Sequence, residues 1–358
     1  MIRFMTRLFG VFSKLAAAYC AMLIFLLAWP ASALALVAVV VWWRKRRKRQ
    51  LTDLGSARWA EAADLLRSGM LGATRGLILG RLPQRHRFFG STIAGIRHSD
   101  ALVRLPHAVH VAIFGPTGAG KGVSFVLPTL LTNPESCVVL DFKGELARQT
   151  AEHRRKRFGH QVALLDPYCT VTATPDSFDP LDFIKEGHPL ALDDCNDLAG
   201  ALVVRSGDEK DPHWADSAEA CIAAVTATVV GYGKPDMRSL QTVREILSHP
   251  ERLELAIKLM RESDLWNGML AQLGGQLTHF ADKEKASVLS STLRHLRFLG
   301  TPAVAATTSS STFDPAQLRR GKLTVYLILP PDRAAAQAGL LRMWVGSMLR
   351  ACVREGLQ

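Results

Sequence analysis

The stretch that decides the fold is His110-Val111-Ala112-Ile113-Phe114-Gly115-Pro116-Thr117-Gly118-Ala119-Gly120-Lys121-Gly122. A short apolar run, expected to be a strand, leads into a glycine-rich turn, and residues 123–127 are suited to begin a helix. The glycines let the backbone bend so that several amide N–H groups face one anion, and the positive end of the helix adds to the attraction. This order predicts a phosphate-binding loop.

The spacing within this stretch matches G-x-x-x-x-G-K, the pattern of a nucleotide-binding loop. The lysine of that pattern, here Lys121, reaches the β- and γ-phosphates, and we assign it the catalytic contact. The next residue is usually Ser or Thr, whose hydroxyl holds Mg²⁺; here it is Gly122, so the pattern identifies no metal ligand. An ordinary glycine turn is the alternative. The expected nucleotide-binding residues are Gly115, Pro116, Thr117, Gly118, Ala119, Gly120, Lys121, Gly122 and Val123.

The net charge of +12 over 358 residues is concentrated at the N-terminus. Residues 1–50 contain nine Lys and Arg and no acid, whereas the other 35 basic and 32 acidic residues leave only +3 for residues 51–358. The basic balance is therefore mainly a membrane feature and does not by itself indicate a nucleic-acid surface. The six cysteines are scattered without a C-x-x-C pair, so we expect buried thiols in a reducing compartment, with neither zinc nor disulfides.

Residues 15–43 form an uncharged, mostly apolar run of 29 residues, long enough to span a bilayer. The basic residues 44–49 that follow are expected to stay in the cytoplasm. A single span and a tight hairpin divided at Pro30 remain open, and a secretory signal is the competing interpretation. Either membrane arrangement places residues 51–358 in the cytoplasm. Residues 51–105 are locally basic, which indicates either a solvated face near an anionic membrane or a nucleic-acid contact; the arginines are Arg75, Arg81, Arg85, Arg87, Arg97 and Arg104.

After the loop, strand and helix patterns alternate. Residues 136–141 read as a strand buried on both faces, 145–157 as a polar helix and 161–167 as the next strand, which is typical of a parallel sheet. Asp141 ends the first of these strands, where ligands of such sheets bind. Its carboxylate is a candidate to orient a metal or water near the γ-phosphate, but it is also placed to cap the following helix or to pair with Lys143.

Helical spacing dominates from residue 190 to 299, with helices expected at 193–204, 215–230, 240–247, 250–261 and 283–299. An apolar strand pattern returns at 322–329, followed by a helix at 340–353. The fold class predicted is α/β. The predicted division is a membrane anchor at 1–50, a linker and start of the cytoplasmic region at 51–105, a nucleotide-binding domain at 106–189 that continues at 301–358, and an all-α insertion at 190–300.

Several stretches together resemble the TraG-like coupling proteins of type IV secretion and conjugation. The most specific are the loop through Gly122 and the string from Val139 to Glu145 with its Asp-x-Lys-Gly-Glu end. Further matches are residues 55–60, Phe178-Asp179-Pro180-Leu181, His213-Trp214 and residues 324–330. In this family the loop commonly ends in Lys-Gly, so Gly122 fits the resemblance.

The resemblance implies a hexameric ATPase anchored in the bacterial inner membrane, with a RecA-like P-loop domain interrupted by an all-α domain. Such a protein uses ATP and Mg²⁺ and recruits relaxase-bound single-stranded DNA or an effector protein to the type IV secretion channel. The family also carries a later apolar strand ending in Asp-Glu, which this sequence lacks. We therefore expect a truncated form with very slow hydrolysis. The alternatives are a catalytically defective anchor or adaptor and a DNA-pumping translocase of the chromosome-segregation kind.

Overall fold

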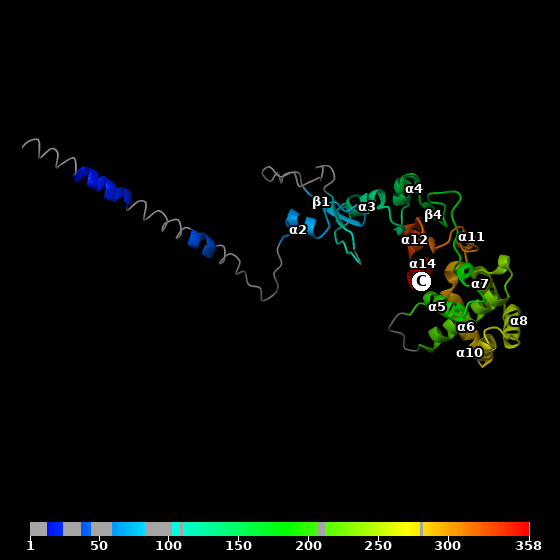
Figure 1. Cartoon of the computed structure of the whole chain (residues 1–358). Helices are drawn as coiled ribbons and strands as arrows, with labels where there is room; N and C mark the ends of the chain where they lie inside the picture. The colour runs from blue at the N-terminus through cyan, green and yellow to red at the C-terminus, as the bar shows by residue number, and fades with distance from the viewer. Residues whose placement is uncertain are drawn as a thin grey trace, which may run out of the picture. The chain divides into compact units, whose positions relative to one another are not determined.

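The structure, a computed structural model, describes residues 13–23, 37–43, 59–82, 102–107, 110–205, 212–279 and 282–357 (Figure 1). The chain divides into two units, Met1–Leu65 and Leu66–Gln358. In the first unit residues 13–23 and 37–43 are helical, and large apolar side chains such as Leu15, Tyr19 and Trp42 are exposed. The part of the chain that the structure describes contains no helix of the length and hydropathy that a membrane span requires. The middle of the predicted span, 24–36, and the basic residues 44–49 lie outside the described residues.

A small antiparallel pair of strands opens the second unit, after α2 (Ala62–Arg67), which begins in the first. β1 (Leu77–Arg81) pairs with β2 (Leu102–Leu105), with Leu77 opposite Leu105.

The main sheet has three parallel strands in the order β3-β5-β4: β3 (Cys137–Asp141), β5 (Leu323–Ile328) and β4 (Gln161–Leu165). Tyr326 of the central strand lies opposite Val139 on one side and Leu164 on the other. All six residues of β5 are buried, because it has a strand on each side and helices on each face. Strands far apart in sequence are thus neighbours in space, as a βα repeat requires.

Different helices cover the two faces of this sheet. Val139, Tyr326 and Ile328 pack with α3 (Leu127–Thr132) and α4 (Glu145–Phe158). Val325 and Leu327, which alternate with the previous pair along β5, belong to a larger core built mostly from the later helices. Successive side chains of a strand point to opposite faces of the sheet, so β5 packs against both of the helical layers that cover it.

The longer helices between β4 and β5 in the chain are α5 (Ala191–Leu202), α6 (His213–Tyr232), α7 (Leu240–Ser248), α8 (Pro250–Arg261), α9 (Met269–Thr278) and α10 (Asp282–His295). The 20-residue α6 is their centre, since it is rich in Ala and Val and most of its residues are buried. Shorter segments link these elements to the sheet: η2 (Pro180–Phe183), η3 (Pro235–Met237), η4 (Arg297–Leu299), α11 (Pro302–Thr307), α12 (Gln317–Arg320) and α13 (Pro331–Ala334). The final helix, α14 (Ala338–Leu357), packs on α5 and buries Trp344.

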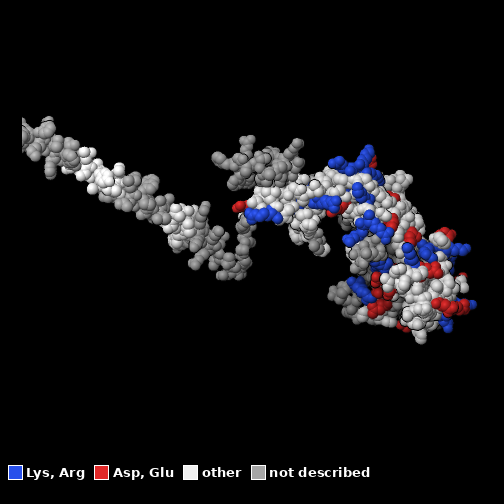
Figure 2. All heavy atoms as spheres, in the orientation of Figure 1, with Lys and Arg blue, Asp and Glu red and all other residues white. Residues whose placement is uncertain are grey.

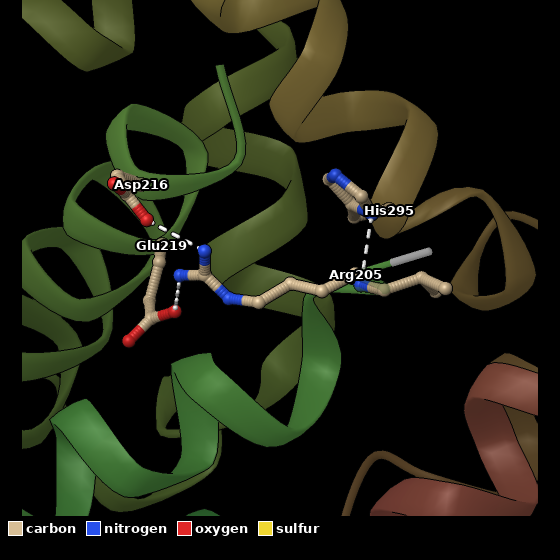
Figure 3. A network of polar contacts seen from close by, with 5 residues as sticks. Arg205, Asp216, Glu219 and His295 are labelled. Atoms are coloured by element: carbon tan, nitrogen blue, oxygen red, sulfur yellow. Dashed lines mark hydrogen bonds and ion pairs between the residues drawn. The ribbon is translucent and has the colours of Figure 1, made fainter. Parts of the chain in front are cut away.

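Acidic and basic side chains are mixed over the helical part of the molecule (Figure 2). One network there joins the end of α5 to α6 and α10 (Figure 3). Arg205 donates to Asp216 at 2.6 Å and to Glu219 at 2.7 Å, and the backbone N–H of Val204 donates to Nδ1 of His295 at 3.3 Å. These contacts hold the chain on both sides as it leaves α5.

Two predictions about strands are corrected. The strand expected at 110–114 is not formed: residues 110–116 have no regular structure and belong to neither sheet, and Val111, Ile113 and Phe114 are exposed. A strand needs a neighbouring backbone that exchanges hydrogen bonds with it, which an apolar pattern alone does not supply. β3 does form, but Val138 and Leu140 are 38% and 45% exposed, because only the face of β3 toward α3 and α4 is covered.

The predictions about cysteine and helix positions are confirmed only in part. All six cysteines are free, and Cys195 and Cys221 are buried, but Cys20 and Cys169 are exposed, so the expectation of buried thiols is wrong for these two. The helix patterns correspond to α4, α5, α6, α7, α8, α10 and α14, whereas α9 was not predicted.

Candidate nucleotide-binding site

The glycine-rich loop makes a tight exposed bend at the start of a helix. Gly118 and Gly120 have φ of +83° and +79°, in the left-handed region that favours glycine. The N–H of Ala119 donates to the carbonyl of Pro116 at 3.2 Å, which closes a turn between them. Thr117 lies inside this turn, and residues 115–119 are all exposed. The sequence pattern thus folds locally into the kind of bend it predicts.

Lys121 folds back over the loop that precedes it. Its Nζ donates to the carbonyl of Gly115 at 2.5 Å and to that of Pro116 at 2.9 Å. An ammonium has three hydrogens, so one remains for a ligand in the loop. The structure therefore brings together Lys121 and the first two residues of the loop and places a positive charge at its exposed mouth.

The helix that starts here is a π-helical turn, η1 (Gly122–Val126), which continues into α3. The first N–H groups of a helix have no intrahelical acceptor, and here they belong to the exposed residues Lys121, Gly122 and Val123. Ser124 is also exposed, and its N–H and its hydroxyl both donate to the carbonyl of Gly120, at 2.8 and 2.7 Å. The helix start thus adds backbone donors and a partial positive charge to the loop.

Asp141 is buried at the carboxyl end of β3, and its Oδ2 accepts a hydrogen bond from the N–H of Ala147 at 2.8 Å. The residue at the N-cap position of α4 is Gly144, which has no side chain to offer, so Asp141 supplies the missing acceptor. Among the residues that the structure describes, no hydrogen bond joins Asp141 to the loop or to Lys143. The geometry favours the helix-cap role over the metal or water role.

A second strand-end carboxylate, Asp166, was not singled out from the sequence. It follows β4, is fully buried, and accepts three backbone N–H groups: Thr170 at 2.9 Å, Val171 at 2.6 Å and Thr172 at 3.2 Å. Its position at the end of an apolar strand, like that of Asp141, was the signal that could have found it. The loop that Asp166 orders packs against Gly144.

The side chains at the loop present few ligands for Mg²⁺. Gly122 has no hydroxyl, the hydroxyl of Ser124 donates to the backbone, and both strand-end carboxylates accept backbone N–H groups. Within the described ranges no three His, Cys, Asp or Glu side chains are grouped together. The loop itself fits a phosphate chain, which requires only amides and a cation.

The arginines of residues 51–105 that the structure describes do not all lie on the surface. Arg75 and Arg81 are exposed, but Arg104 is buried, and it donates to the carbonyl of Gly76 at 3.1 Å. Burial lowers the pKa of Arg104 from its ordinary value. Arg85, Arg87 and Arg97 lie outside the described residues.

These features define a mixed α/β protein with a glycine-rich loop at the start of a helix. Residues 49–356 match the family model described as Type IV secretory system Conjugative DNA transfer. The chain belongs to this family.

Curated relatives carry names consistent with that family. The chain is 29% identical over 311 residues to a conjugal transfer protein TraG of Escherichia coli, covering 83% of this chain and 48% of that protein. It is 29% identical over 299 residues to the protein VirD4 of Rhizobium radiobacter, covering 81% and 40%. The chain spans about half the length of the curated relatives it matches.

Among solved structures, the plasmid coupling protein TrwB in complex with the non-hydrolysable ATP analogue ADPNP aligns with a TM-score of 0.44 and 18% identity. The alignment covers 64% of this chain and 49% of that one. TrwB has also been solved in complex with ADP and Mg²⁺, with a TM-score of 0.38 and 14% identity over 61% of this chain and 52% of that one.

Proposed function

We propose that this chain is the ATP-binding part of a coupling ATPase of type IV secretion and conjugative DNA transfer. In this role it recruits relaxase-bound single-stranded DNA or an effector protein and delivers it to the channel proteins of the secretion system. The observation that carries the proposal is the loop at 115–121, with Lys121 folded over Gly115 and Pro116 at a helix start, in a chain of this family. The names of the relatives support the same assignment.

In the proposed site the triphosphate lies in the bend formed by residues 115–123. Backbone amides at the start of η1 bind phosphate oxygens, and the ammonium of Lys121 neutralises charge on the β- and γ-phosphates. The positive φ of Gly118 and Gly120 is what lets the backbone turn its amides toward one point. Mg²⁺ supplies charge neutralisation in enzymes of this kind, but the loop pattern identifies no ligand for it, so no step of the mechanism here depends on it.

We further propose that the nucleotide-binding domain is RecA-like and made of residues 106–189 and 301–358, interrupted by an all-α domain at 190–300. The position of α5 to α10 between β4 and β5 supports this division. A hexameric state for the complete protein follows from the family resemblance alone.

Residues 1–50 are proposed to anchor the protein in the bacterial inner membrane, with the linker 51–105 and the rest of the chain in the cytoplasm. The uncharged run at 15–43 and the basic residues 44–49 support this. So do the exposed apolar side chains of the helical segments at 13–23 and 37–43.

Nucleotide binding to the full chain tests the site. A fluorescent ATP analogue is titrated against the wild type, Lys121→Ala and, as a control, Lys156→Ala, which removes an exposed lysine that pairs with Glu152 on α4. We expect Lys121→Ala to weaken binding about tenfold or more, equivalent to roughly 1.4 kcal/mol, and Lys156→Ala to leave it unchanged. Equal affinity in all three proteins would remove the site assignment.

A second candidate is an anchor or adaptor that binds nucleotide without hydrolysing it. The observation in its favour is that Asp141 and Asp166 are both committed to backbone amides. Phosphate release measured with ATP and Mg²⁺ on the same preparations separates the two. Turnover that is lost in Lys121→Ala supports the ATPase, whereas Lys121-dependent binding without turnover supports the adaptor.

A further inference from the structure

Arg154 is a buried cation that has no carboxylate among its hydrogen-bond partners. It lies on α4, is 1% exposed, and uses all of its N–H groups. Nε donates to the hydroxyl of Thr324 at 2.7 Å; one terminal nitrogen donates to the carbonyls of Leu130 at 2.6 Å and Asn133 at 3.0 Å; the other donates to the carbonyl of Glu135 at 2.6 Å and to Nδ1 of His160 at 3.4 Å. A buried guanidinium is expensive unless it is fully bonded, which this one is.

Two of these partners are the carbonyls at the C-terminal end of α3. Leu130 lies in its last turn and Asn133 is its C-cap residue. The last carbonyls of a helix lack intrahelical donors and carry a partial negative charge, so a cation there satisfies both needs. The carbonyl of Glu135 belongs to the connection from α3 to β3. Arg154 therefore binds the last turn of α3 and the connection that follows it, which together are called the exit of α3 below.

Thr324 and His160 connect Arg154 and the end of α3 to the central strand. Thr324 lies on β5, and its hydroxyl accepts from Arg154 and contacts Nδ1 of His160 at 2.8 Å. Nε2 of His160 contacts the carbonyl of Pro134 at 2.9 Å, so it carries the proton and Nδ1 is the acceptor. Burial, together with the nearby charge of Arg154, lowers the pKa of His160.

The helix held in this way is the one that begins at the nucleotide loop. η1 and α3 run without a break from Gly122 to Thr132, and only Thr129 and Leu130 of these residues are buried. A cavity of about 270 Å³ lies beside the same exit, lined by Thr129, Leu130, Asn133 and Arg154 among others. The buried apolar packing of this helix is therefore confined to its C-terminal end, at Leu130, where the hydrogen bonds of Arg154 add to it.

We infer that Arg154 is a positioning residue for nucleotide binding: it ties the exit of α3 to β5 and so holds the loop at the other end of the same helix. The inference rests on the proposed nucleotide site. A rigid helix of two to three turns transmits a tilt at its exit to its first turn, where the amides of the loop converge. All N–H groups of Arg154 are bonded within the protein, so it acts on the loop through α3.

The test compares Arg154→Met and Arg154→Lys with Tyr326→Phe in the full chain. Tyr326→Phe removes the contact of its hydroxyl with Thr150 at 2.5 Å, one turn away on the same α4–β5 interface, and leaves the ring and every hydrogen bond of Arg154 to the end of α3 in place. Affinity for a fluorescent ATP analogue is measured at a temperature where circular dichroism shows every variant folded. Hydrogen exchange of residues 122–132 is measured alongside.

We expect Arg154→Met to weaken binding about tenfold and to speed exchange in 122–132, because one end of the helix is released. Arg154→Lys recovers part of the affinity, since an ammonium can still reach the helix end. Tyr326→Phe stays within about twofold of the wild type although it also costs stability. If Arg154→Met does not fold, Thr324→Val takes its place, because it leaves the arginine but cuts its link to β5.

Wild-type affinity and wild-type exchange in folded Arg154→Met, or in Thr324→Val in its place, overturn the inference and leave the nucleotide site standing. Equal weakening in Tyr326→Phe also overturns it, since any loss of stability would then suffice. Absence of Lys121-dependent binding in the wild type overturns the proposed function and this inference together.

Discussion

Gly144 and Val171 approach so closely that a β-carbon on Gly144 would lie 2.2 Å from Cγ2 of Val171. Gly144 also has a φ of +70°, in the left-handed region. Val171 is held in place by Asp166, which accepts its backbone N–H at 2.6 Å. The turn that starts α4 and the loop that follows β4 therefore fit together at the carboxyl edge of the sheet only with a glycine at position 144.

Replacing this glycine tests the fit. We expect Gly144→Ala to lower the free energy of unfolding by roughly 2–4 kcal/mol, because a strained backbone is combined with overpacking. Gly159→Ala is the matched control, since Gly159 has the same φ of +70° but nothing within 4 Å of an added β-carbon. Its expected cost is about 1 kcal/mol. Urea unfolding measures both, and equal losses would contradict the contact with Val171.

The role of Asp141 is testable by separating stability from metal dependence. If its carboxylate caps α4 through Ala147, Asp141→Ala lowers the free energy of unfolding by roughly 1–2 kcal/mol. The affinity for a fluorescent ATP analogue then changes less than about twofold, with or without Mg²⁺. A large loss of affinity confined to Mg²⁺-containing buffer would instead support the metal- or water-orienting role.

The cysteines should differ sharply in reactivity. Cys169 is exposed, whereas Cys195 and Cys221 are buried, and burial raises the pKa of Cys195 to about 12 and that of Cys221 to about 11. Because the thiolate is the nucleophile, we expect iodoacetamide at pH 8 to modify Cys169 in the native protein and the buried pair only after urea is added. Peptide mass mapping gives the result. Native modification of Cys195 as fast as that of Cys169 would contradict the described core.

The sequence predicts elements best where the signal is local. The apolar run at 322–329 identifies the central strand, and the glycines before Lys121 identify a bend that the structure forms with positive φ. The run at 110–114 looks similar but forms no strand, because pairing depends on a neighbour elsewhere in the chain. α9 escaped prediction because Gly274 and Gly275 lower its helix propensity. Gly274 lets α9 pack closely on α8, since a β-carbon added at this position would lie 2.6 Å from Cβ of Met260.

The polar framework of the candidate site could not be predicted for a related reason. Arg154 is one of four consecutive basic residues on a polar helix, a pattern typical of a solvated face, yet it is buried against α3 and β5. Asp141 was correctly placed at a strand end, but its partner Ala147 became evident only with the geometry of the turn. Burial of a charge depends on which distant carbonyls and hydroxyls converge on it, and no local pattern encodes that.

Asp179 leads to a prediction about pH. It is fully buried, and its two oxygens accept the N–H of Leu181 and that of Leu240 at the start of α7, both at 2.8 Å. Burial raises its pKa from 3.8 to about 7; the two hydrogen bonds oppose this rise and the charge of Asp182 adds to it. Between these values the folded chain keeps a proton that the unfolded chain releases. The contribution of Asp179 to stability is therefore complete below about pH 4 and lost as the pH rises through 7.

The corresponding change is on the order of 4 kcal/mol across this window. Asp179→Asn, which cannot ionise, should remove it, at the cost of one backbone hydrogen bond at low pH, because an amide offers a single acceptor oxygen. Urea unfolding of both proteins from pH 4 to 8 measures the effect as the difference between their profiles, so that the titration of other carboxylates cancels. We expect the variant to be the less stable protein at pH 4 and to lose this disadvantage by pH 8. Parallel profiles would mean that Asp179 carries the same charge in the folded and unfolded chain, and its burial between η2 and α7 would then need another explanation.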